Sequence, residues 1–275
     1  MCGICGFVSK NSINIDQIKK NIFGMLSVLN HRGPDNTSHW ISDDNNIVLG
    51  HTRLSIIDLS SNGNQPMLSE NNRIVISYNG ETYNHINLRK EFNKNIYRGN
   101  SDTETILSYF EKYGFHKTLE QIDGMFSIAM FNKKERNLYL ARDRFGEKPL
   151  YYYVSNENII FGSEIKTLLK HNLIKKDINA NVLHDYFSFN YIGGNDTIYK
   201  NIKKVLPAHY LKINIDTLKF EEIPYWNRTK KKNQYIKNIE QATDLVEKKL
   251  IDSIDKRLTS DLPVGCFLSG GIDSS

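Results

Sequence analysis

The chain has 275 residues, 24% of them charged and 39% hydrophobic, which is the composition of a folded globular protein and excludes wholesale disorder. Its 36 basic and 31 acidic residues leave a net charge of +5, scattered along the chain, so we expect no nucleic-acid partner. No apolar run approaches the ~20 residues of a transmembrane helix, and the N-terminus lacks the pattern of a signal peptide, so we expect no membrane partner either. Three cysteines, an odd number, argue against a disulfide scaffold and indicate a reducing compartment, the cytoplasm.

Apolar residues at helical spacing predict a helix that contains Ile15, Ile18, Ile22, Leu26 and Leu29, and another over residues 103–113. Strand-like runs occupy much of the rest: residues 4–9, 47–54, 73–78, 125–131, 138–141, 150–154 and 159–162. Several of these runs are joined by only a few turn residues, which favours antiparallel hairpins over parallel crossovers. The chain up to about Leu211 is therefore predicted to be an α+β domain with much antiparallel sheet.

The composition changes after this domain. We predict a first domain over residues 1–215 and a linker over 216–238, which contains the polar, basic run NRTKKKNQYIKN. Its three consecutive lysines indicate a solvated face rather than a binding patch. Helical spacing returns from Ile239, and an apolar strand over 264–268, with Cys266 buried in it, leads into SGGIDSS. A strand and a glycine-rich turn without a following helix are half a unit, so residues 239–275 are expected to be the truncated start of a second domain.

The second residue is a cysteine followed by glycine, and initiator methionine is commonly removed before such small residues. Removal of Met1 would leave a thiol and a free α-amine on Cys2. The amine titrates near pKa ~7.7–8.0 and a thiol near ~8.5, so the amine could take the thiol proton without a histidine or aspartate. A lone cysteine is more often a small residue that opens a strand, and Cys5 has that interpretation. A C-x-x-C metal site is disfavoured, because no second Cys/His pair follows at suitable spacing, so we expect no metal in this domain.

Further motifs decide between the two interpretations of Cys2. MCGICGF, HRGPD, HTRLSIID, YNGETYN and SDTE occur in this order, and together they resemble the N-terminal-nucleophile (class II) glutamine amidotransferases. ARDRFGEKPLYY, FGSEIKTLL, LPAHYL and FLSGGIDSS narrow the resemblance to glutamine-hydrolysing asparagine synthetase, over the whole chain. The resemblance implies a four-layer αββα sandwich, followed by the first elements of an α/β ATP-pyrophosphatase domain.

Hydrolysis of a glutamine amide needs a nucleophile, an oxyanion hole and a clamp for the α-amino acid group. The resemblance assigns the nucleophile to Cys2 and the oxyanion hole to the side-chain amide of Asn79 and the backbone N–H of Gly80. Taken by themselves, Asn79 and Gly80 favour a type I′ hairpin turn, and a turn could serve both roles. Arg32 in HRGPD is expected either to order the surroundings of the nucleophile or to be purely structural.

The clamp needs a cation and an anion. Arg53 could form two parallel hydrogen bonds to the glutamine carboxylate, and Asp102, with Glu81, could bind the α-ammonium group. By themselves these residues are ordinary surface charges, and Ser101 or Asp102 is also a helix N-cap candidate. The residues that the resemblance assigns to glutamine binding are Arg53, Leu54, Ser55, Ile56, Ile57, Asn79, Gly80, Glu81 and Asp102.

The SGGIDSS run lacks the G-K-[ST] of a Walker motif and resembles the pyrophosphate loop of ATP pyrophosphatases. Its glycines let backbone N–H groups turn toward an anion, and its serines add hydroxyl donors. A flexible linker is the alternative, which the preceding apolar strand disfavours. The residues expected to bind ATP, with Mg²⁺ in the full-length enzyme, are Leu268, Ser269, Gly270, Gly271, Asp273, Ser274 and Ser275.

The resemblance implies that Cys2 frees ammonia from glutamine through a γ-glutamyl thioester, without a cofactor. The ammonia then amidates aspartate that ATP has activated, with release of AMP and pyrophosphate. Another carboxylate or a sugar as acceptor is the alternative, since acceptor-binding residues would lie beyond Ser275, although SGGIDSS disfavours the sugar enzymes. A catalytically silent module is disfavoured, because no catalytic position is replaced. The 275 residues are expected to be competent for the glutaminase step alone; the oligomeric state stays open, with a homodimer as one option.

Overall fold

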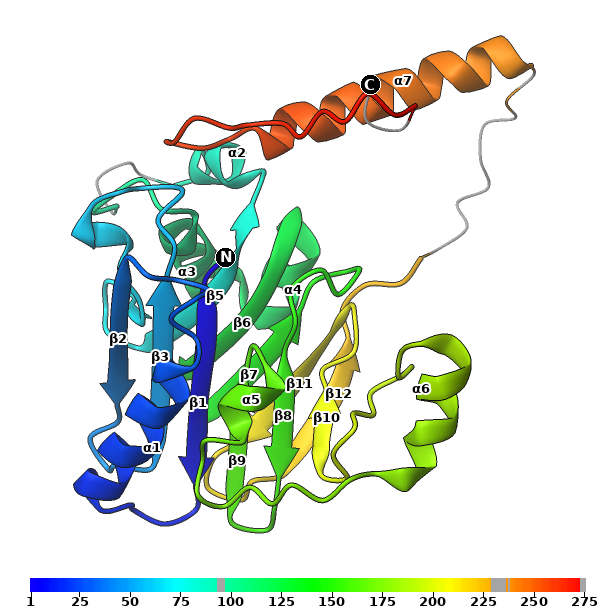
Figure 1. The fold of residues 1–275 in the computed structure, drawn as a ribbon. Helices are drawn as coiled ribbons and strands as arrows, with labels where there is room; N and C mark the ends of the chain where they lie inside the picture. Colours follow the sequence, from blue (N-terminus) through cyan, green and yellow to red (C-terminus); the bar gives the residue numbers. More distant parts are fainter. Residues whose placement is uncertain (93–96, 229–235, 237, 273–275) are drawn as a thin grey trace.

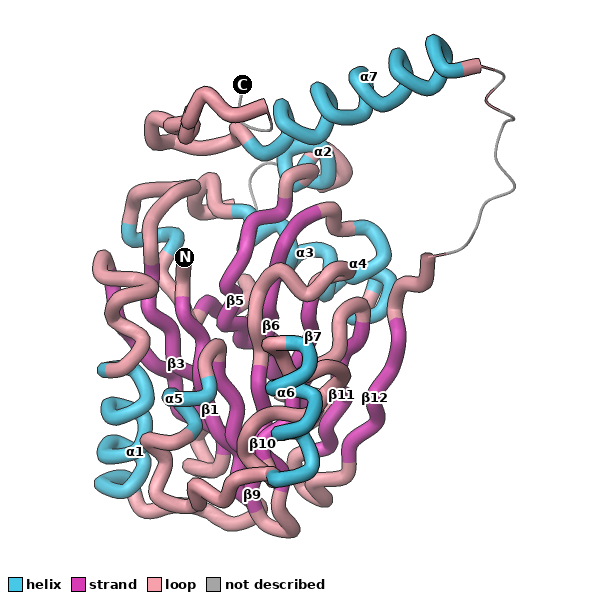
Figure 2. The backbone as a smooth tube through the Cα atoms, turned by 45° about the vertical axis from the view of Figure 1, so that its right-hand side comes forward, coloured by secondary structure: helices cyan, strands magenta, loops and turns pink. Residues whose placement is uncertain are grey.

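The computed structural model describes residues 1–92, 97–228, 236 and 238–272 of the chain. Two antiparallel sheets of six strands each face one another, and helices cover both outer faces (Figure 1). The predicted four-layer αββα sandwich is therefore confirmed. A long helix near the C-terminus lies outside these layers, above the end of the sandwich at which the N-terminus lies (Figures 1 and 2).

The first sheet has the strand order β10-β8-β9-β1-β3-β2. Its strands are β1 (Gly3–Ser9), β2 (Asn36–Ile41), β3 (Ile47–Arg53), β8 (Tyr151–Val154), β9 (Asn158–Gly162) and β10 (Ile202–Lys204). The N-terminal strand β1 is central, paired with β3 on one side and with β9 on the other. Pairing with both β3 and β9 therefore fixes the position of the first residues of the chain.

The second sheet has the strand order β12-β11-β7-β6-β5-β4. Its strands are β4 (Met67–Leu68), β5 (Ile74–Thr82), β6 (Gly124–Asn132), β7 (Asn137–Arg142), β11 (His209–Asn214) and β12 (Phe220–Pro224). The prediction of a turn at Asn79-Gly80 is wrong, because both residues lie inside β5, opposite Ser127 and Phe126 of β6. The polar Asn-Gly pair was compatible with a turn, but β5 continues to Thr82 because β6 supplies a partner along its whole length.

Helices cover the outer face of each sheet. The first sheet is covered by α1 (Ile15–Ser27) and α5 (Ile165–Leu168), and the second by α2 (His85–Arg89), α3 (Asp102–Tyr113) and α4 (Phe115–Gln121). The remaining helical elements are η1 (Ser61–Gly63), η3 (Ala180–Val182), α6 (Leu183–Phe189) and α7 (Ile239–Arg257). Helix α1 begins where the side chain of Asn14 accepts a hydrogen bond from the backbone N–H of Asp16, and asparagine is among the residues preferred at this capping position.

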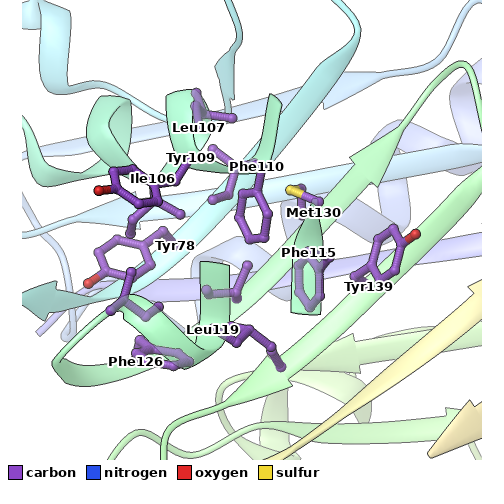
Figure 3. Packing of buried hydrophobic residues seen from close by; sticks show 14 of the residues in the cluster. Tyr78, Ile106, Leu107, Tyr109, Phe110, Phe115, Leu119, Phe126, Met130 and Tyr139 are labelled. Atoms are coloured by element: carbon purple, nitrogen blue, oxygen red, sulfur yellow. The ribbon is translucent and has the colours of Figure 1, made fainter. Parts of the chain in front are cut away.

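Three apolar clusters fill the spaces between the layers. Tyr78, Phe110, Phe115 and Leu119 belong to the cluster between the second sheet and its helices, where Phe115 stacks on Phe110 with ring centroids 4.6 Å apart (Figure 3). The cluster between the two sheets takes alternate residues of the facing strands, as the period of two in a strand requires. The sandwich is thus held by burial on both faces of both sheets.

The first domain extends further than the boundary predicted at residue 215. Strand β12 pairs with β11 and completes the second sheet, and Tyr225 is buried in the core, with its hydroxyl donating to the carbonyl of Arg142 over 2.8 Å. The linker predicted from residue 216 therefore begins too early. Residues 229–235 and 237, which contain most of its basic run, lie outside the described residues.

The C-terminal segment differs from the prediction in two respects. Residues 264–268 do not form a strand, because no described strand lies beside them to supply hydrogen-bond partners. Cys266, predicted to be buried, is exposed for the same reason. The predicted helix from Ile239 is confirmed as α7, but none of its residues is buried.

Candidate active site

The period of two in the strands brings the predicted catalytic groups to the same space. Ile4 and Val8 of β1 point into the gap between the sheets, so Cys2, two residues before Ile4, has the same orientation. In β5, Val75 points into that gap from the opposite sheet, and Asn79 follows it at the same parity. The predicted nucleophile, Cys2, and the amide of the predicted oxyanion hole, Asn79, therefore come from opposite sheets to the same space, and both line one pocket.

A pocket lies at this end of the gap. Of the residues predicted to act on glutamine, it is lined by Cys2, Arg53, Leu54, Ile56, Ile57, Asn79, Gly80, Glu81 and Asp102. Ser55 is the exception: it does not line the pocket, and its backbone N–H donates to Asp35 over 2.7 Å. These residues come from the position before β1, the end of β3, the loop after β3, β5 and the start of α3, so only the tertiary fold brings them together.

The thiol of Cys2 lies against the backbone of Leu54. The N–H of Leu54 donates to Sγ over 3.4 Å, and Sγ is 3.6 Å from the carbonyl oxygen of the same residue. Burial raises the pKa of the Cys2 thiol, so the thiol needs a nearby base to become a nucleophile. Cys5, by contrast, is fully buried in the cluster beneath α1, in agreement with its structural interpretation.

Two cations flank the first residues of the chain. Arg32 donates through Nε to the carbonyl of Cys2 over 2.9 Å and through Nη1 to Glu164 over 3.0 Å. Lys148 is 5% exposed, and its Nζ is 3.2 Å from Sδ of Met1. Burial lowers the pKa of the α-amine of Met1, and the charges of Arg32 and Lys148 lower it further, against the charges of Cys2 and Glu81. A lowered pKa keeps more of the amine neutral and able to accept a proton.

The groups predicted for the oxyanion hole are held by β6. The side chain of Asn79 is 1% exposed, and its Nδ2 donates to Oγ of Ser127 over 3.4 Å. Gly80 lies so close to β6 that an added Cβ would be 2.7 Å from Cα of Phe126 and would clash with the carbonyl of Met125. Glycine is required here for close backbone approach, independently of any role of its N–H.

Arg53 lines the pocket but also holds the loop that follows β3. Its Nη1 donates to the carbonyl of Ser60 over 2.7 Å and to Oδ1 of Asn64 over 2.8 Å, and its Nη2 donates to the carbonyl of Asp58. Arg53 is 5% exposed, so these bonds fix the direction of the guanidinium group. The sequence did not indicate this second set of partners.

Asp102 is the first residue of α3, and Ser101 caps the helix, as one of the two N-cap alternatives predicted. Oδ2 of Asp102 accepts a hydrogen bond from the backbone N–H of Thr82 over 2.9 Å. Burial raises the pKa of Asp102 to about 6, and the nearby charge of Glu81 also raises it. Burial likewise raises the pKa of Glu81, although Lys148 opposes the shift. The pocket therefore contains two carboxyl groups that are costly to ionise without a cationic partner.

Lys148 and Gln65 are among the lining residues that were not identified from the sequence. Lys148 lies within ARDRFGEKPLYY, a motif that the resemblance used only to narrow the family, so the signal was present. Gln65 accepts from the N–H of Tyr78 over 2.6 Å and donates to Oγ1 of Thr103 over 3.3 Å. No sequence pattern marks Gln65, because its role arises from contacts between β5 and α3.

The segment predicted to be a phosphate loop does not line this pocket in its described part. Leu268 is 74% exposed, and Gly270 has a φ of 73°, in the left-handed region that favours glycine. Oγ of Ser269 accepts from the N–H of Gly271 over 3.5 Å. Asp273, Ser274 and Ser275 lie outside the described residues. Among the residues that the structure describes, no cluster of three or more His, Cys, Asp or Glu side chains could hold a metal ion, and no helix has the length and apolarity needed to cross a membrane.

A cysteine near the N-terminus, at the end of a gap between two facing antiparallel sheets with helices outside, is the architecture of the N-terminal-nucleophile glutamine amidotransferases. Residues 1–226 match the family model described as glutamine amidotransferase domain, and residues 245–275 match the model described as asparagine synthase. The chain therefore belongs to the glutamine amidotransferase domain family.

Relatives support this assignment, and a solved structure shares the fold. The chain is 37% identical to the putative asparagine synthetase [glutamine-hydrolyzing] 2 of Methanocaldococcus jannaschii, over 100% of the chain and 56% of that protein. It is 33% identical to the amidase chry2 of Gibberella zeae, over 100% of the chain and 42% of that protein. The fold matches glutamine phosphoribosylpyrophosphate amidotransferase from B. subtilis with a TM-score of 0.58 and 15% identity, over 82% of the chain and 49% of that structure. The chain thus spans about half the length of these relatives.

Proposed function

We propose that this chain hydrolyses the side-chain amide of glutamine, with Cys2 as the nucleophile. The observation that carries the proposal is the meeting of Cys2, Asn79 and Asp102, from three distant parts of the sequence, around one pocket. Family membership supports the same reaction. The three cysteines are free thiols, as a reducing compartment such as the cytoplasm would keep them.

The reaction begins once Met1 has been removed and the α-amine belongs to Cys2. That amine takes the thiol proton, and the thiolate attacks the amide carbon of glutamine. The side chain of Asn79 and the N–H of Gly80 donate to the oxyanion of the tetrahedral intermediate. The protonated amine then gives its proton to the departing nitrogen, which leaves as ammonia, and water hydrolyses the thioester to glutamate. Arg32, whose Nε donates to the carbonyl of Cys2 over 2.9 Å, is proposed to hold the first residue in place for this transfer.

Binding of glutamine is proposed to use the two ends of the α-amino acid group. Arg53 would bind the carboxylate and Asp102, with Glu81, the ammonium group. Pairing with an ammonium ion would offset the cost of ionising Asp102, whose pKa is raised to about 6 by burial. Leu54, Ser55, Ile56 and Ile57 would complete this subsite, with Ser55 acting through the backbone of the loop rather than as a lining residue.

In the whole protein we propose that the ammonia amidates aspartate activated by ATP, with Mg²⁺, as the match of residues 245–275 suggests. The described part of the phosphate loop suits an anion, because Gly270 is left-handed and nothing lies within 4 Å of the position of a Cβ there. The backbone from Leu268 to Gly271 and the hydroxyl of Ser269 would hold the phosphates, together with Asp273, Ser274 and Ser275. ATP would supply the activation of the acceptor carboxylate.

A second candidate is amidation of a different acceptor, another carboxylate or a sugar. The observation in its favour is the 33% identity to a relative named amidase chry2, which also extends over the whole chain. Supplying aspartate and other carboxylates in turn to the full-length protein, with ATP and ammonia, distinguishes the two candidates by the amide formed. An asparagine product supports the first candidate.

The glutaminase proposal is tested by glutamate release from glutamine, combined with intact-mass analysis. The active form should begin at Cys2, and an uncleaved N-terminal tag should abolish activity because it converts the basic amine into an amide. A tag at the C-terminus is the matched control and should leave glutamate release unchanged. A tagged protein with an acylated Cys2 nitrogen and full activity would show that the α-amine is not the base.

A further inference from the structure

Asp58, which the proposed reaction does not use, joins three parts of the molecule. Oδ1 accepts from the N–H of Ser60 over 3.0 Å and from its hydroxyl over 2.5 Å, and Oδ2 accepts from the N–H of Asn100 over 2.8 Å. Its own carbonyl accepts from Nη2 of Arg53. Asp58 is 7% exposed and has a φ of 58°, a conformation that aspartate tolerates better than most residues do.

Through Arg53 and Asn100, Asp58 is connected to both ends of the proposed glutamine clamp. Arg53 is the proposed carboxylate ligand, and Asn100 lies two residues before Asp102, the proposed ammonium ligand. An added Cβ on Gly99 would clash with Oδ2 of Asp58, so glycine at position 99 is what allows the carboxylate to approach this turn. One aspartate therefore fixes the spacing between the loop after β3 and the start of α3.

The segment after α7 binds the same loop from outside. Oδ2 of Asp261 accepts from the N–H of Asp58 over 2.7 Å, and the N–H of Asp261 donates to the carbonyl of Ile56 over 3.0 Å. Ile56 lines the pocket. In one bond the loop donates to the side chain of Asp261, and in the other the backbone of Asp261 donates to the loop. The two bonds together set both the distance and the register of the contact. In the views of Figures 1 and 2 this segment lies over the end of the sandwich at which the N-terminus lies.

We infer that Asp58 and Asp261 are positioning residues for glutamine binding, through which the C-terminal segment holds the loop that is hydrogen-bonded to Arg53, the carboxylate end of the clamp. This inference rests on the proposed glutaminase function. Asp58 holds Arg53 and the α3 turn at a fixed separation, and Asp261 holds Asp58. Release of this contact loosens the substrate clamp, while the proposed nucleophile, directly before β1, and the proposed oxyanion hole, on β5, keep their places. The affinity for glutamine falls and the rate of the bound complex does not.

The test compares Asp261→Ala with Asp261→Asn and Lys256→Ala in the 275-residue chain. Asparagine keeps an acceptor for the N–H of Asp58, whereas alanine does not. Lys256 is the matched control, because its exposed ion pair with Asp123, 3.4 Å long, anchors the same segment away from the loop. Asp261→Ala should raise KM for glutamine about tenfold with kcat within twofold, as expected for loss of one charge-assisted hydrogen bond. Asp261→Asn should restore most of the affinity, and Lys256→Ala should keep wild-type values.

Amide hydrogen exchange separates this inference from the proposed function. The N–H of Asp58 should exchange faster in Asp261→Ala than in the wild type, whether or not the protein hydrolyses glutamine. Failure of the wild type to release glutamate contradicts the proposed function, whereas unchanged exchange at Asp58 overturns the inference. A fall in kcat equal to the rise in KM, or an equal effect of Lys256→Ala, also overturns it. Asp58→Gly, which keeps the backbone conformation but removes the carboxylate, should raise KM at least as far as Asp261→Ala does.

Discussion

Two helices with similar apolar spacing, α3 and α7, differ in how much of their surface is buried. Helix α3 buries eight of its twelve residues against the second sheet. Helix α7, with nineteen residues, buries none, and Val246, Leu250 and Ile254 are each more than half exposed. The difference teaches that apolar periodicity predicts a helix, whereas burial requires a sheet or helix that presents a matching face.

The same contrast separates the two proposed sites. The glutamine pocket is made of side chains held from several directions, and Asn79, Arg53 and Asp102 are each no more than 5% exposed. The described part of the proposed phosphate loop is exposed. The C-terminal segment that carries it touches the sandwich near the end of α7, through Lys256, Arg257 and Asp261. We therefore expect the sandwich to hold the proposed catalytic side chains in place. The C-terminal segment should affect their positions through these contacts.

Removal of the proposed nucleophile is expected to have the largest effect on glutamate release. Cys2→Ala should reduce glutamate release to background, because no other described thiol lines the pocket. Cys266→Ala, in the exposed segment, is the matched control and should leave the rate unchanged. Both are measured as glutamate formed per minute at saturating glutamine. Residual activity of Cys2→Ala above background would remove Cys2 from the mechanism.

Asn79→Ala should lower kcat by ~10²–10³, the usual effect of removing one oxyanion donor, with a much smaller change in KM. Ser127→Ala tests whether the oxygen 3.4 Å from Nδ2 orients this amide, and it should lower kcat by about tenfold or less. Steady-state kinetics on the two variants gives the comparison. If Ser127→Ala lowered kcat as far as Asn79→Ala, Asn79 would not be the principal donor.

A pair of leucine truncations measures the difference in burial directly. Leu119→Ala in α4, where the side chain is fully buried, should lower the free energy of unfolding by about 2–5 kcal/mol. Leu250→Ala in α7, where the side chain is 57% exposed, should change it by no more than about 0.5 kcal/mol. Urea unfolding of both variants, followed by a probe of the sandwich, gives the two values. Equal destabilisation would mean that α7 is packed in solution against a surface that the structure leaves uncovered.

The raised pKa of Asp102 predicts a pH dependence of glutamine binding. Protonation of the carboxyl group removes the partner of the α-ammonium, so kcat/KM should fall as the pH drops through about 6, approaching tenfold per pH unit. Asp102→Asn should have a low kcat/KM throughout and should lack this inflection. The Lys256→Ala variant should keep the wild-type profile, since Lys256 lies outside the pocket.

The same shift predicts a smaller effect on stability. Because the pKa of Asp102 is higher in the folded state than the ordinary value of 3.8, the folded protein binds more protons between pH 4 and 6. The stability that protonated Asp102 contributes to the folded state is therefore present at low pH and is lost as the pH rises through about 6. Asp102→Asn should gain stability relative to the wild type on going from pH 4 to pH 7. Thermal unfolding at both pH values measures this, and a difference of opposite sign would contradict the raised pKa.

Much of the sandwich could be predicted from the sequence by itself. The runs at residues 4–9 and 73–78, for example, alternate between the two faces of a strand and were identified as strands, which the structure confirms. Strand β12 could not be identified, because its residues are polar and exposed and it forms only by pairing with the edge of β11. For residues 264–268 the error is the reverse, because a strand was predicted and none forms. An apolar run becomes a strand only where a neighbouring strand is present to share its hydrogen bonds.

For the site, the sequence by itself determined the reactive residue types: a cysteine next to the initiator methionine, an Asn-Gly pair, and an Asp at a helix start. These are local features that chemistry and family motifs can identify. Tertiary structure alone decided that Asn79 lies inside a strand, that Lys148 is buried beside the N-terminus, and that Asp58 is bound by Asp261, 203 residues later. Such contacts join residues far apart in the chain, and they depend on how the sheets and loops pack rather than on any pattern of neighbouring residues.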